Sequence, residues 1–594
     1  MQKKQVFLSK KFIYIKEEKE KSRIRSERIL DKRWCIKIKK QTKQNSFMQG
    51  VVVLMFSQVI IKIVGLIYKL YLTNKEGFGD RGNAIYGGAF QIYAIFLTIS
   101  SIGVPNAISK LVSGKVAVGD NKGAYRIFKI AFAIFGLLGF IGSSILFFGA
   151  NYIANNYLQI PESEIAILAL APSVFLVSIT SVLRGYFNGK ENLSVTANSQ
   201  SLEQLFKTLL TILIVEQISS ISSNNTVFMA GAAALATTLA TLTSLVYLYR
   251  FFIKRKKEVW QEIISSKIHR RDSVIKIVKS ILCVSIPIAL CALFSVLSKT
   301  IDAFTVVRIL SNTIGEEKAT LIYGILNGKV DTLITLPFSF NIAFSTALVP
   351  TISAAVAKRD MNIAKRRIEF SILVTILIGI PCSLCMCIFS KQILDLLFPN
   401  ASSGAQMLSF ASWTIIFVVL IQTINGALQG LGKLNVPVIA FAIGAIIKLI
   451  FNIVLMPIIG VIGAIISSIL SHFVSFIICF ISLRRNMGIS FKINKFLIKP
   501  VIANIIMVMV TYMLYIRLYS LIQSKLILLI TLLIGIIIYI MLIFMLKIFS
   551  QEEIFMIPYG QKIYKRIKKD KKEKILKLSK INGFTTHKTW KPRE

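Results

Sequence analysis

Two lysines occur inside an apolar run near the start of the chain. Lys62 lies fifteen residues into the run 47–73, and Lys69 follows seven residues later on the same helical face. Gln58 and Gly65 complete a stripe of polar or small residues. A lysine ammonium binds phosphate as a point charge with three donors, so the stripe predicts a track for a diphosphate. Snorkelling towards a helix end is the alternative, and it suits Lys69 better than Lys62.

Two aspartates fall within later apolar segments. Asp302 lies three residues after Lys299 in the segment 280–310. The segment 322–357 carries a stripe at helical spacing made of Asn327, Asp331, Thr335 and Ser339. A charge at the bilayer centre costs about 3 kcal/mol, which makes both aspartates, with Lys299, candidates for binding a coupling cation or for gating. A structural salt bridge between helices explains them equally well.

Four further residues complete the candidate site. Asn327 and Lys329 are candidates for contact with a cargo, although Lys329 points to a different face from Asp331 and is the weaker candidate. Glu203 and Lys207 are spaced i, i+4 on one predicted helix, which suits an ion pair. They could take part in coupling or gating, but an internal ion pair that locks one bundle is the favoured interpretation.

Composition indicates which elements must position these residues. Hydrophobic residues make up 54% of the 594-residue chain and charged residues only 17%, and the mean hydropathy is +0.67. Several runs of about twenty residues lack any charge, which is enough to cross a bilayer as a helix. The short alternating strands of a β-barrel are absent. The sequence therefore predicts an all-α polytopic membrane protein.

Hydropathy predicts about fourteen transmembrane helices. Their expected spans are 47–73, 84–109, 127–150, 165–187, 196–216, 226–250, 280–310, 322–357, 368–390, 404–429, 435–456, 459–482, 497–518 and 525–548. Alternate loops are strongly basic, as at 250–279, whereas the intervening loops are not. This pattern predicts a plasma-membrane protein with both termini in the cytoplasm, and it argues against nucleic acid as the reason for the net charge of +43.

The chain also repeats itself. The stretch from Gly185 to Val195 resembles the stretch from Gly426 to Val436 at an offset of 241, and Lys207 falls opposite Lys448 at the same offset. Both stretches fall on the same predicted side of the membrane, so the repeats are expected to be parallel. We expect a basic cytoplasmic extension at 1–46, an N-lobe of six helices at 47–252, a basic linker at 253–279, a C-lobe of six helices at 280–482, two added helices at 483–548 and a basic tail at 549–594. Either Met1 or Met48 could be the true start.

Little in the sequence suggests an enzyme. The largest loop has about thirty residues, and a globular domain needs at least about 50. The close cysteines Cys382, Cys385 and Cys387 are interpreted as small apolar residues of a helix, and the three histidines are too scattered for a metal centre. We expect no cofactor other than a possible coupling cation of unknown identity.

Several motifs together carry a family resemblance. They are Lys62-Ile-Val-Gly65, Gly103-Val-Pro-Asn-Ala-Ile-Ser-Lys110, Leu183-Arg-Gly-Tyr-Phe-Asn-Gly189, Ser199-Gln-Ser-Leu-Glu-Gln204, Ile286-Pro-Ile288 and Asp302-Ala-Phe-Thr-Val-Val-Arg308. The chain resembles the Gram-positive MurJ (YtgP) branch of the MOP flippase superfamily from residue 47 to about 550. Gram-negative members carry arginines on the first, second and eighth helices. Here the first helix has lysines, and Leu97 and Thr332 occupy the other two places.

The resemblance implies a flippase for lipid II, the undecaprenyl-diphosphate-linked peptidoglycan precursor, with two lobes and a central cavity. The expected partners are this or a related undecaprenyl-diphosphate glycolipid and the membrane lipids, and the protein is expected to be a monomer. Flipping of another polyprenyl-linked polysaccharide, of the sporulation or O-antigen type, is the nearest alternative. A cation-coupled drug or metabolite exporter of the same fold, a membrane scaffold without transport and an embedded glycosyltransferase are the others.

Overall fold

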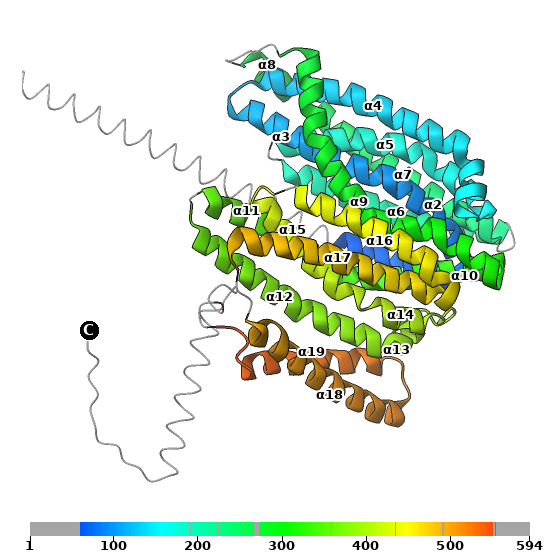
Figure 1. Cartoon of the computed structure of the whole chain (residues 1–594). Helices are drawn as coiled ribbons and strands as arrows, with labels where there is room; N and C mark the ends of the chain where they lie inside the picture. The colour runs from blue at the N-terminus through cyan, green and yellow to red at the C-terminus, as the bar shows by residue number, and fades with distance from the viewer. Residues whose placement is uncertain are drawn as a thin grey trace, which may run out of the picture. The chain divides into compact units, whose positions relative to one another are not determined.

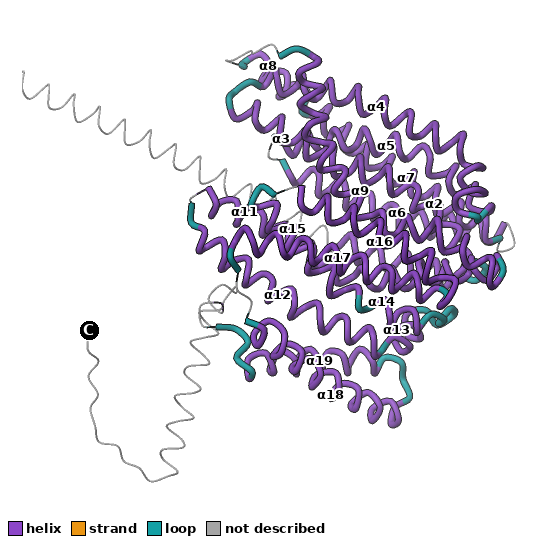
Figure 2. Tube along the Cα trace, viewed as in Figure 1, coloured by secondary structure: helices purple, strands orange, loops and turns teal. Residues whose placement is uncertain are grey.

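The computed structural model describes residues 60–550 and Glu553, except residues 191, 222–224, 267–271, 358, 434 and 490–491. Within these residues the chain forms helices joined by short turns, and no strand occurs (Figures 1 and 2). The all-α class is confirmed. The predicted N-terminal extension, the start of the first helix and almost all of the basic tail lie outside the described residues.

Contacts divide the chain into two compact units. Unit 1 contains the residues up to Tyr68, Gly88–Tyr157 and Pro161–Val296, and unit 2 contains Lys69–Gly87, Leu158–Ile160 and the residues from Leu297 onwards. The helix 60–74 and helices α2 and α9 therefore contribute residues to both units. The lobe boundaries expected at residues 252 and 280 stay predictions.

The helices of the first half are long. In chain order they are α2 (Gly79–Thr98), α3 (Val104–Ala117), α4 (Asn121–Tyr152), α5 (Glu164–Gly189), α6 (Leu193–Ile221), α7 (Thr226–Lys254), α8 (Lys256–Ile264) and α9 (Val274–Ile314). A π turn at Ile99–Gly103 joins α2 to α3 without a break. In unit 1, α5 packs against α3, α4 and α7, and α6 packs on α7 (Figure 1).

The second half continues in the same way. Its helices are α10 (Glu316–Ile325), α11 (Asp331–Ala357), α12 (Met361–Ile388), α13 (Ser390–Leu397), α14 (Ala405–Ala411), α15 (Thr414–Gly430), α16 (Asn435–Ile459), α17 (Val461–Met487), α18 (Lys499–Ile522) and α19 (Ile527–Met545). A π turn at Leu326–Val330 joins α10 to α11. In unit 2, α15 packs against α11, α12 and α17, whereas α18 and α19 pair with each other and contact α12 through α18.

The predicted transmembrane segments are mostly helical where they are described, although turns interrupt some of them, as at residues 412–413 between α14 and α15. Eleven helical segments in the described part of the chain are long and apolar enough to cross a membrane. They correspond to eleven of the fourteen expected spans and establish a multi-pass membrane protein. The spans 47–73, 84–109 and 322–357 are not among them, so the count of fourteen stays a prediction.

Glycines bring two helices of unit 1 into close contact. A Cβ atom added at Gly185 of α5 would lie 3.0 Å from the carbonyl oxygen of Pro105 in α3. One turn later, a Cβ at Gly189 would lie 2.7 Å from the Cβ of Val112. Small residues four apart let helix backbones approach closely, and here any side chain would separate α5 from α3.

The equivalent glycines act in the same way in unit 2. A Cβ added at Gly426 of α15 would lie 2.8 Å from the carbonyl oxygen of Ser345 in α11, and one at Gly430 would lie 2.8 Å from the Cβ of Ile352. The repeat found in the sequence is thus a repeat of helix packing. In the sequence, Val104-Pro105 followed by Ile108-Ser109 also echoes Val349-Pro350 followed by Ile352-Ser353. The glycine contacts align the partner helices differently, because they match Pro105 with Ser345 and not with Pro350.

We expect Gly185→Ala and Gly426→Ala each to lower stability by about 1–3 kcal/mol, since the new methyl group meets backbone atoms that cannot move aside. The measurement is the thermal midpoint of the purified protein in detergent. Gly136→Ala in α4 is the matched control, because nothing lies within 4 Å of its added Cβ. Equal midpoints for Gly185→Ala and Gly136→Ala would contradict the packing role.

A charged cluster fastens the start of α9 to the end of α3. Lys115 Nζ lies 2.6 Å from an Asp272 carboxylate oxygen and 3.1 Å from Asp120. The hydrogen bond from Lys115 lowers the pKa of Asp272, and the same bond to Asp272 raises the pKa of Lys115. Asp120 also accepts a hydrogen bond from the Gly123 amide and so caps α4. The cluster therefore joins Asp272, two residues before α9, to the end of α3 and the start of α4.

The lowered pKa of Asp272 means that its contact with Lys115 stabilises the fold at neutral pH, and that this contribution is lost as pH falls through the folded-state pKa, below about pH 4. The raised pKa of Lys115 keeps the contribution up to about pH 10. We expect Asp272→Asn to lower the thermal midpoint by a constant amount between about pH 5 and 9, and by less under acid conditions. If the gap between the thermal midpoints of wild type and Asp272→Asn widened towards acid pH, the contact between Asp272 and Lys115 would not be its cause.

Candidate functional site

The two lysines of the first helix differ in their surroundings. Lys62 is exposed and belongs to unit 1. Lys69 is only 7% exposed, and its ammonium lies 5.6 Å from the centre of the Tyr86 ring, within unit 2. Such a contact is a cation–π interaction, which favours the charged form of the lysine in an apolar setting. Gln58, the third member of the expected stripe, lies outside the described residues.

Asp302 of α9 binds a lysine from another helix. Its carboxylate lies 2.6 Å from Lys448 Nζ of α16 and accepts a second hydrogen bond from the Asn452 amide at 3.1 Å. Lys448 also donates to the Ser468 hydroxyl of α17. Both Lys448 and Asn452 are fully buried. Asp302 therefore forms an interhelical salt bridge, one of the two interpretations that its sequence position left open.

Asp331 and Lys299 form the second pair of unit 2. Lys299 Nζ lies 3.2 Å from the Asp331 carboxylate, which joins α9 to the start of α11. The lysine is 36% exposed and the aspartate 19%. Lys299 thus pairs with Asp331 and not with Asp302, three residues away on its own helix. This pair is more accessible than the Asp302–Lys448 pair and is the better placed of the two to open.

Lys329 is completely buried. Its ammonium lies 2.9 Å from the Asp80 carboxylate at the start of α2, and it donates to the Ala401 carbonyl at 2.7 Å and to the Ser403 hydroxyl at 2.9 Å. All three ammonium donors are therefore directed at protein oxygens. This geometry makes Lys329 an anchor that ties the π turn to α2 and to the loop before α14.

Asn327 lies in the same π turn and is partly buried. A Cβ added at Gly87 of α2 would lie 2.4 Å from its amide oxygen. The π turn separates Asn327 from the rest of the expected stripe, because Asp331, Thr335 and Ser339 follow in α11. Asn327 therefore lies in a π turn and Asp331 in an α-helix, so regular α-helical spacing does not relate the two side chains.

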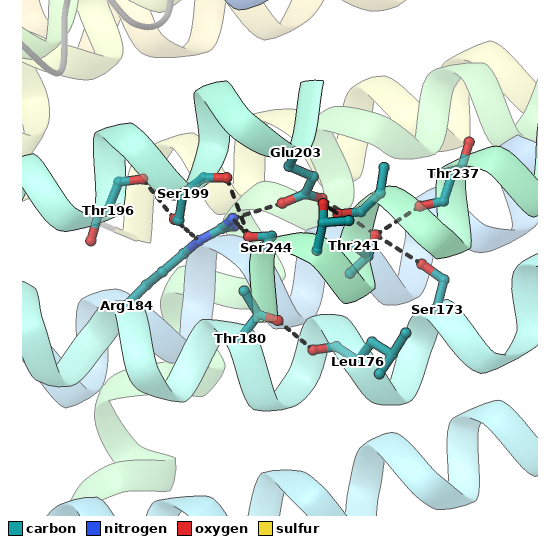
Figure 3. Close-up of polar contacts among 12 residues, drawn as sticks. Ser173, Leu176, Thr180, Arg184, Thr196, Ser199, Glu203, Thr237, Thr241 and Ser244 are labelled. Carbon is teal, nitrogen blue, oxygen red and sulfur yellow. Dashed lines mark hydrogen bonds and ion pairs between the residues drawn. The ribbon is translucent and has the colours of Figure 1, made fainter. Parts of the chain in front are cut away.

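Glu203 in unit 1 pairs with an arginine from another helix, as Figure 3 shows. Arg184 of α5 donates to the Glu203 carboxylate of α6 at 2.7 Å, to the Ser199 hydroxyl at 3.0 Å and to the Ser244 hydroxyl of α7 at 2.9 Å. Thr241 of α7 donates to the other Glu203 oxygen at 3.4 Å. The network joins three helices of unit 1 through one guanidinium.

Lys207 lies one turn after Glu203 but has different neighbours. Its ammonium lies 5.0 Å from the centre of the Tyr68 ring and 4.8 Å from the centre of the Phe90 ring. The spacing i, i+4 predicted an ion pair between Glu203 and Lys207, and the salt bridge that the structure shows for Glu203 is with Arg184. Arg184 takes the carboxylate because its planar fork reaches Glu203 and two hydroxyls at once.

Three partners of the candidate residues were not assigned from the sequence. They are Asp80, Arg184 and Lys448. Asp80 resembles an ordinary loop acid in the sequence, since it lies beside Arg81 in a segment of balanced charge. For Arg184 and Lys448 a signal exists, because each is a base within an apolar segment, and such a base needs a nearby acid.

The family described as "Polysaccharide biosynthesis protein" matches residues 47–356. The chain belongs to this family. The MatE family also matches, over residues 322–454. Among relatives, stage V sporulation protein B of Bacillus subtilis (strain 168) is 26% identical over 71% of this chain and 80% of its own. Lipid II flippase MurJ of the same organism is 25% identical over 69% of this chain and 78% of its own.

Solved structures of the MOP superfamily share the fold of this polysaccharide biosynthesis family member. Lipid II flippase MurJ in an inward closed conformation matches 83% of this chain and 98% of its own with a TM-score of 0.61 and 14% identity. An inward-facing multidrug resistance MATE family transporter matches 74% and 98% with a TM-score of 0.59 and 14% identity. The resemblance to the MOP superfamily is confirmed, and its families are transporters and flippases.

We expect Arg184→Met to destabilise the protein by about 3 kcal/mol, because it leaves the Glu203 carboxylate without a cation. The double variant Arg184→Met with Glu203→Met should recover much of this loss, since it removes both charges. Thermal midpoints in detergent measure both effects. A double variant no more stable than Arg184→Met would show that the ion pair is not what the arginine supplies.

Proposed function

We propose that this protein moves a polyprenyl-diphosphate-linked saccharide from the cytoplasmic to the outer leaflet of the plasma membrane, and that lipid II is its cargo. The observation that carries the proposal is the presence of lysine ammonium groups within apolar helices. Lys69 lies beside the Tyr86 ring and Lys207 beside the Phe90 ring, and Lys62 lies on the same predicted helical face as Lys69. A lysine ammonium binds phosphate as a point charge, so such positions suit an anionic headgroup.

The charge of the loops supports the direction of transport. Basic loops are expected on the cytoplasmic side, and they alternate with loops that are not basic, which supports a cytoplasmic location for both termini. A diphosphate leaving a negative cytoplasm gains about 2.3 kcal/mol per charge per 100 mV of membrane potential. Outward movement of the headgroup therefore needs no chemical change of the cargo.

In this proposal the lysines act as charge partners for the diphosphate while the polyprenyl chain stays in lipid. Lys62 is exposed, so an approaching anion can reach it, and Lys69 lies beside the Tyr86 ring. Gln58 and Asn327 are proposed to contact the saccharide. Lys329 acts as a structural anchor, since its donors are directed at protein oxygens. The headgroup then crosses by alternating access.

A different polyprenyl-linked glycan is the second candidate. The family description names polysaccharide biosynthesis in general, and stage V sporulation protein B is as similar to this chain as lipid II flippase MurJ. Lysines within the apolar helices suit any diphosphate-linked glycan equally. They disfavour a drug exporter of the MATE type that carries organic cations, because like charges would repel.

We expect purified protein in liposomes to move fluorescent lipid II between leaflets, measured by the fraction of fluorophore that an added membrane-impermeant reductant bleaches. Lys62→Ala should reduce the rate at least about tenfold, which is the loss expected for one charge contact of about 1.4 kcal/mol. Lys62→Arg should keep most activity, because the charge remains.

The surface variant Lys122→Ala, at the exposed start of α4, is the matched control and should behave as wild type. Movement of a polyprenyl-diphosphate carrying another glycan, with none of lipid II, would select the second candidate. Equal rates for wild type and Lys62→Ala would remove Lys62 from the mechanism. Movement of an organic cation with no glycolipid would overturn the proposal.

A further inference from the structure

The ammonium of Lys448 occupies the centre of a buried oxygen cluster in unit 2. The side chain is 1% exposed, and its Nζ lies 2.6 Å from Asp302 and within hydrogen-bond distance of the Ser468 hydroxyl. These groups come from three helices, α9, α16 and α17. A cation is therefore already present at a carboxylate that, from its sequence position, could have held a coupling ion.

The remaining members of the cluster are also oxygen-bearing groups. Asn452, one turn after Lys448, donates its amide to Asp302 at 3.1 Å and to the Thr305 hydroxyl at 2.9 Å. Its amide oxygen is buried and has no hydrogen-bond partner. A buried acceptor left unsatisfied costs about 1–3 kcal/mol and calls for an explanation. Carboxylate, amide and hydroxyl oxygens together are the ligands that hard cations prefer.

We propose that this cluster is a monovalent-cation site permanently filled by Lys448, so that a tethered ammonium replaces a diffusible ion. A bound ion can leave when its site rearranges, whereas the lysine stays within reach of its own helix. The charge that holds α9, α16 and α17 together is then supplied covalently. The protein consequently needs neither Na⁺ nor K⁺ at Asp302.

The sequence repeat provides an internal comparison. Lys207 lies 241 residues before Lys448 and is the matching lysine of unit 1. Its ammonium faces the rings of Tyr68 and Phe90, and the nearby carboxylate of Glu203 is paired with Arg184. At the same repeat position, Lys207 lies beside two aromatic rings and Lys448 lies within an oxygen cluster. The oxygen cluster at Lys448 provides ligands for a metal ion when that lysine is shortened.

The test is the thermal midpoint of detergent-purified protein in NaCl, KCl or choline chloride at equal ionic strength. Wild type should show the same midpoint in all three salts. Lys448→Ala removes the ammonium and opens space beside Asp302, so its midpoint should fall in choline and rise by several degrees in NaCl or KCl, because an ion that binds only the folded state stabilises it.

Three variants control for other effects of the substitution. Lys448→Met removes the charge but fills the space, and should be destabilised equally in all salts. Lys448→Ala combined with Asp302→Asn lacks the carboxylate and should lose the response to Na⁺ and K⁺. Lys207→Ala deletes the matching lysine of unit 1, whose ammonium lies beside the Tyr68 and Phe90 rings, and should show no difference between salts.

Two results would overturn the inference. One is a wild-type midpoint that rises in NaCl or KCl relative to choline chloride, which would mean that an ion binds in spite of Lys448. The other is a folded Lys448→Ala protein whose thermal midpoint does not respond to Na⁺ or K⁺.

If Lys448→Ala does not fold in any salt, wild-type transport in liposomes tests the inference instead. Transport that stops when choline replaces Na⁺ and K⁺ would contradict a tethered cation. This arm alone rests on the proposed function, and a lack of lipid II movement in every salt would refute that function and leave the thermal measurement valid.

Discussion

A carboxylate within a lipid bilayer must have a cation beside it, and this constraint organises both units. Isolated charges are costly in hydrocarbon, so each acid draws a base from another helix. The resulting pairs are Glu203–Arg184, Asp302–Lys448, Asp331–Lys299 and Asp80–Lys329. Apolar side chains are as well solvated by lipid as by another helix, so apolar contacts alone select no particular neighbouring helix. Each ion pair supplies that selection by joining two specific segments. The pairs therefore fix which helices are neighbours.

Salt bridges are not the only contacts that hold a lysine within the apolar helices. The ammonium groups of Lys69 and Lys207 lie beside aromatic rings, which stabilise a cation without cancelling its charge. Ion pairs between helices and ammonium groups beside rings are thus two distinct ways in which charge is held in this bundle. The proposed binding of an anionic cargo depends on the second.

Much of the fold could be predicted from the sequence, because a bilayer demands long apolar helices. The described parts of the expected segments are mostly helical, and eleven of the segments are long and apolar enough to cross a membrane. The partners of the charged residues were harder to predict. Spacing within one helix suggested Glu203 with Lys207 and placed Lys299 near Asp302, yet each acid pairs across helices. Helical spacing shows which residues share a face, but it does not show which face of another helix lies opposite.

The repeat illustrates the same limit. Glycines at matching positions were visible in the sequence and make matching close contacts in the two units. The aligned prolines were misleading, because the glycine contact places Ser345 opposite Pro105. A proline echo reflects local chain preferences, whereas the glycine contact reflects the distance between two backbones. Features that depend on contact between helices are thus the more reliable guide to an internal repeat.

The π turn at Leu326–Val330 has a consequence for comparing this chain with its relatives. A π turn holds one residue more than an α turn of the same span, and that extra residue is absorbed without changing the outward faces of the helices on either side. Lys329, the anchor of the region, lies within it. A one-residue difference in length between two chains of this fold could therefore be absorbed in this segment, with Gly324 and Asp331 keeping their helical faces on either side.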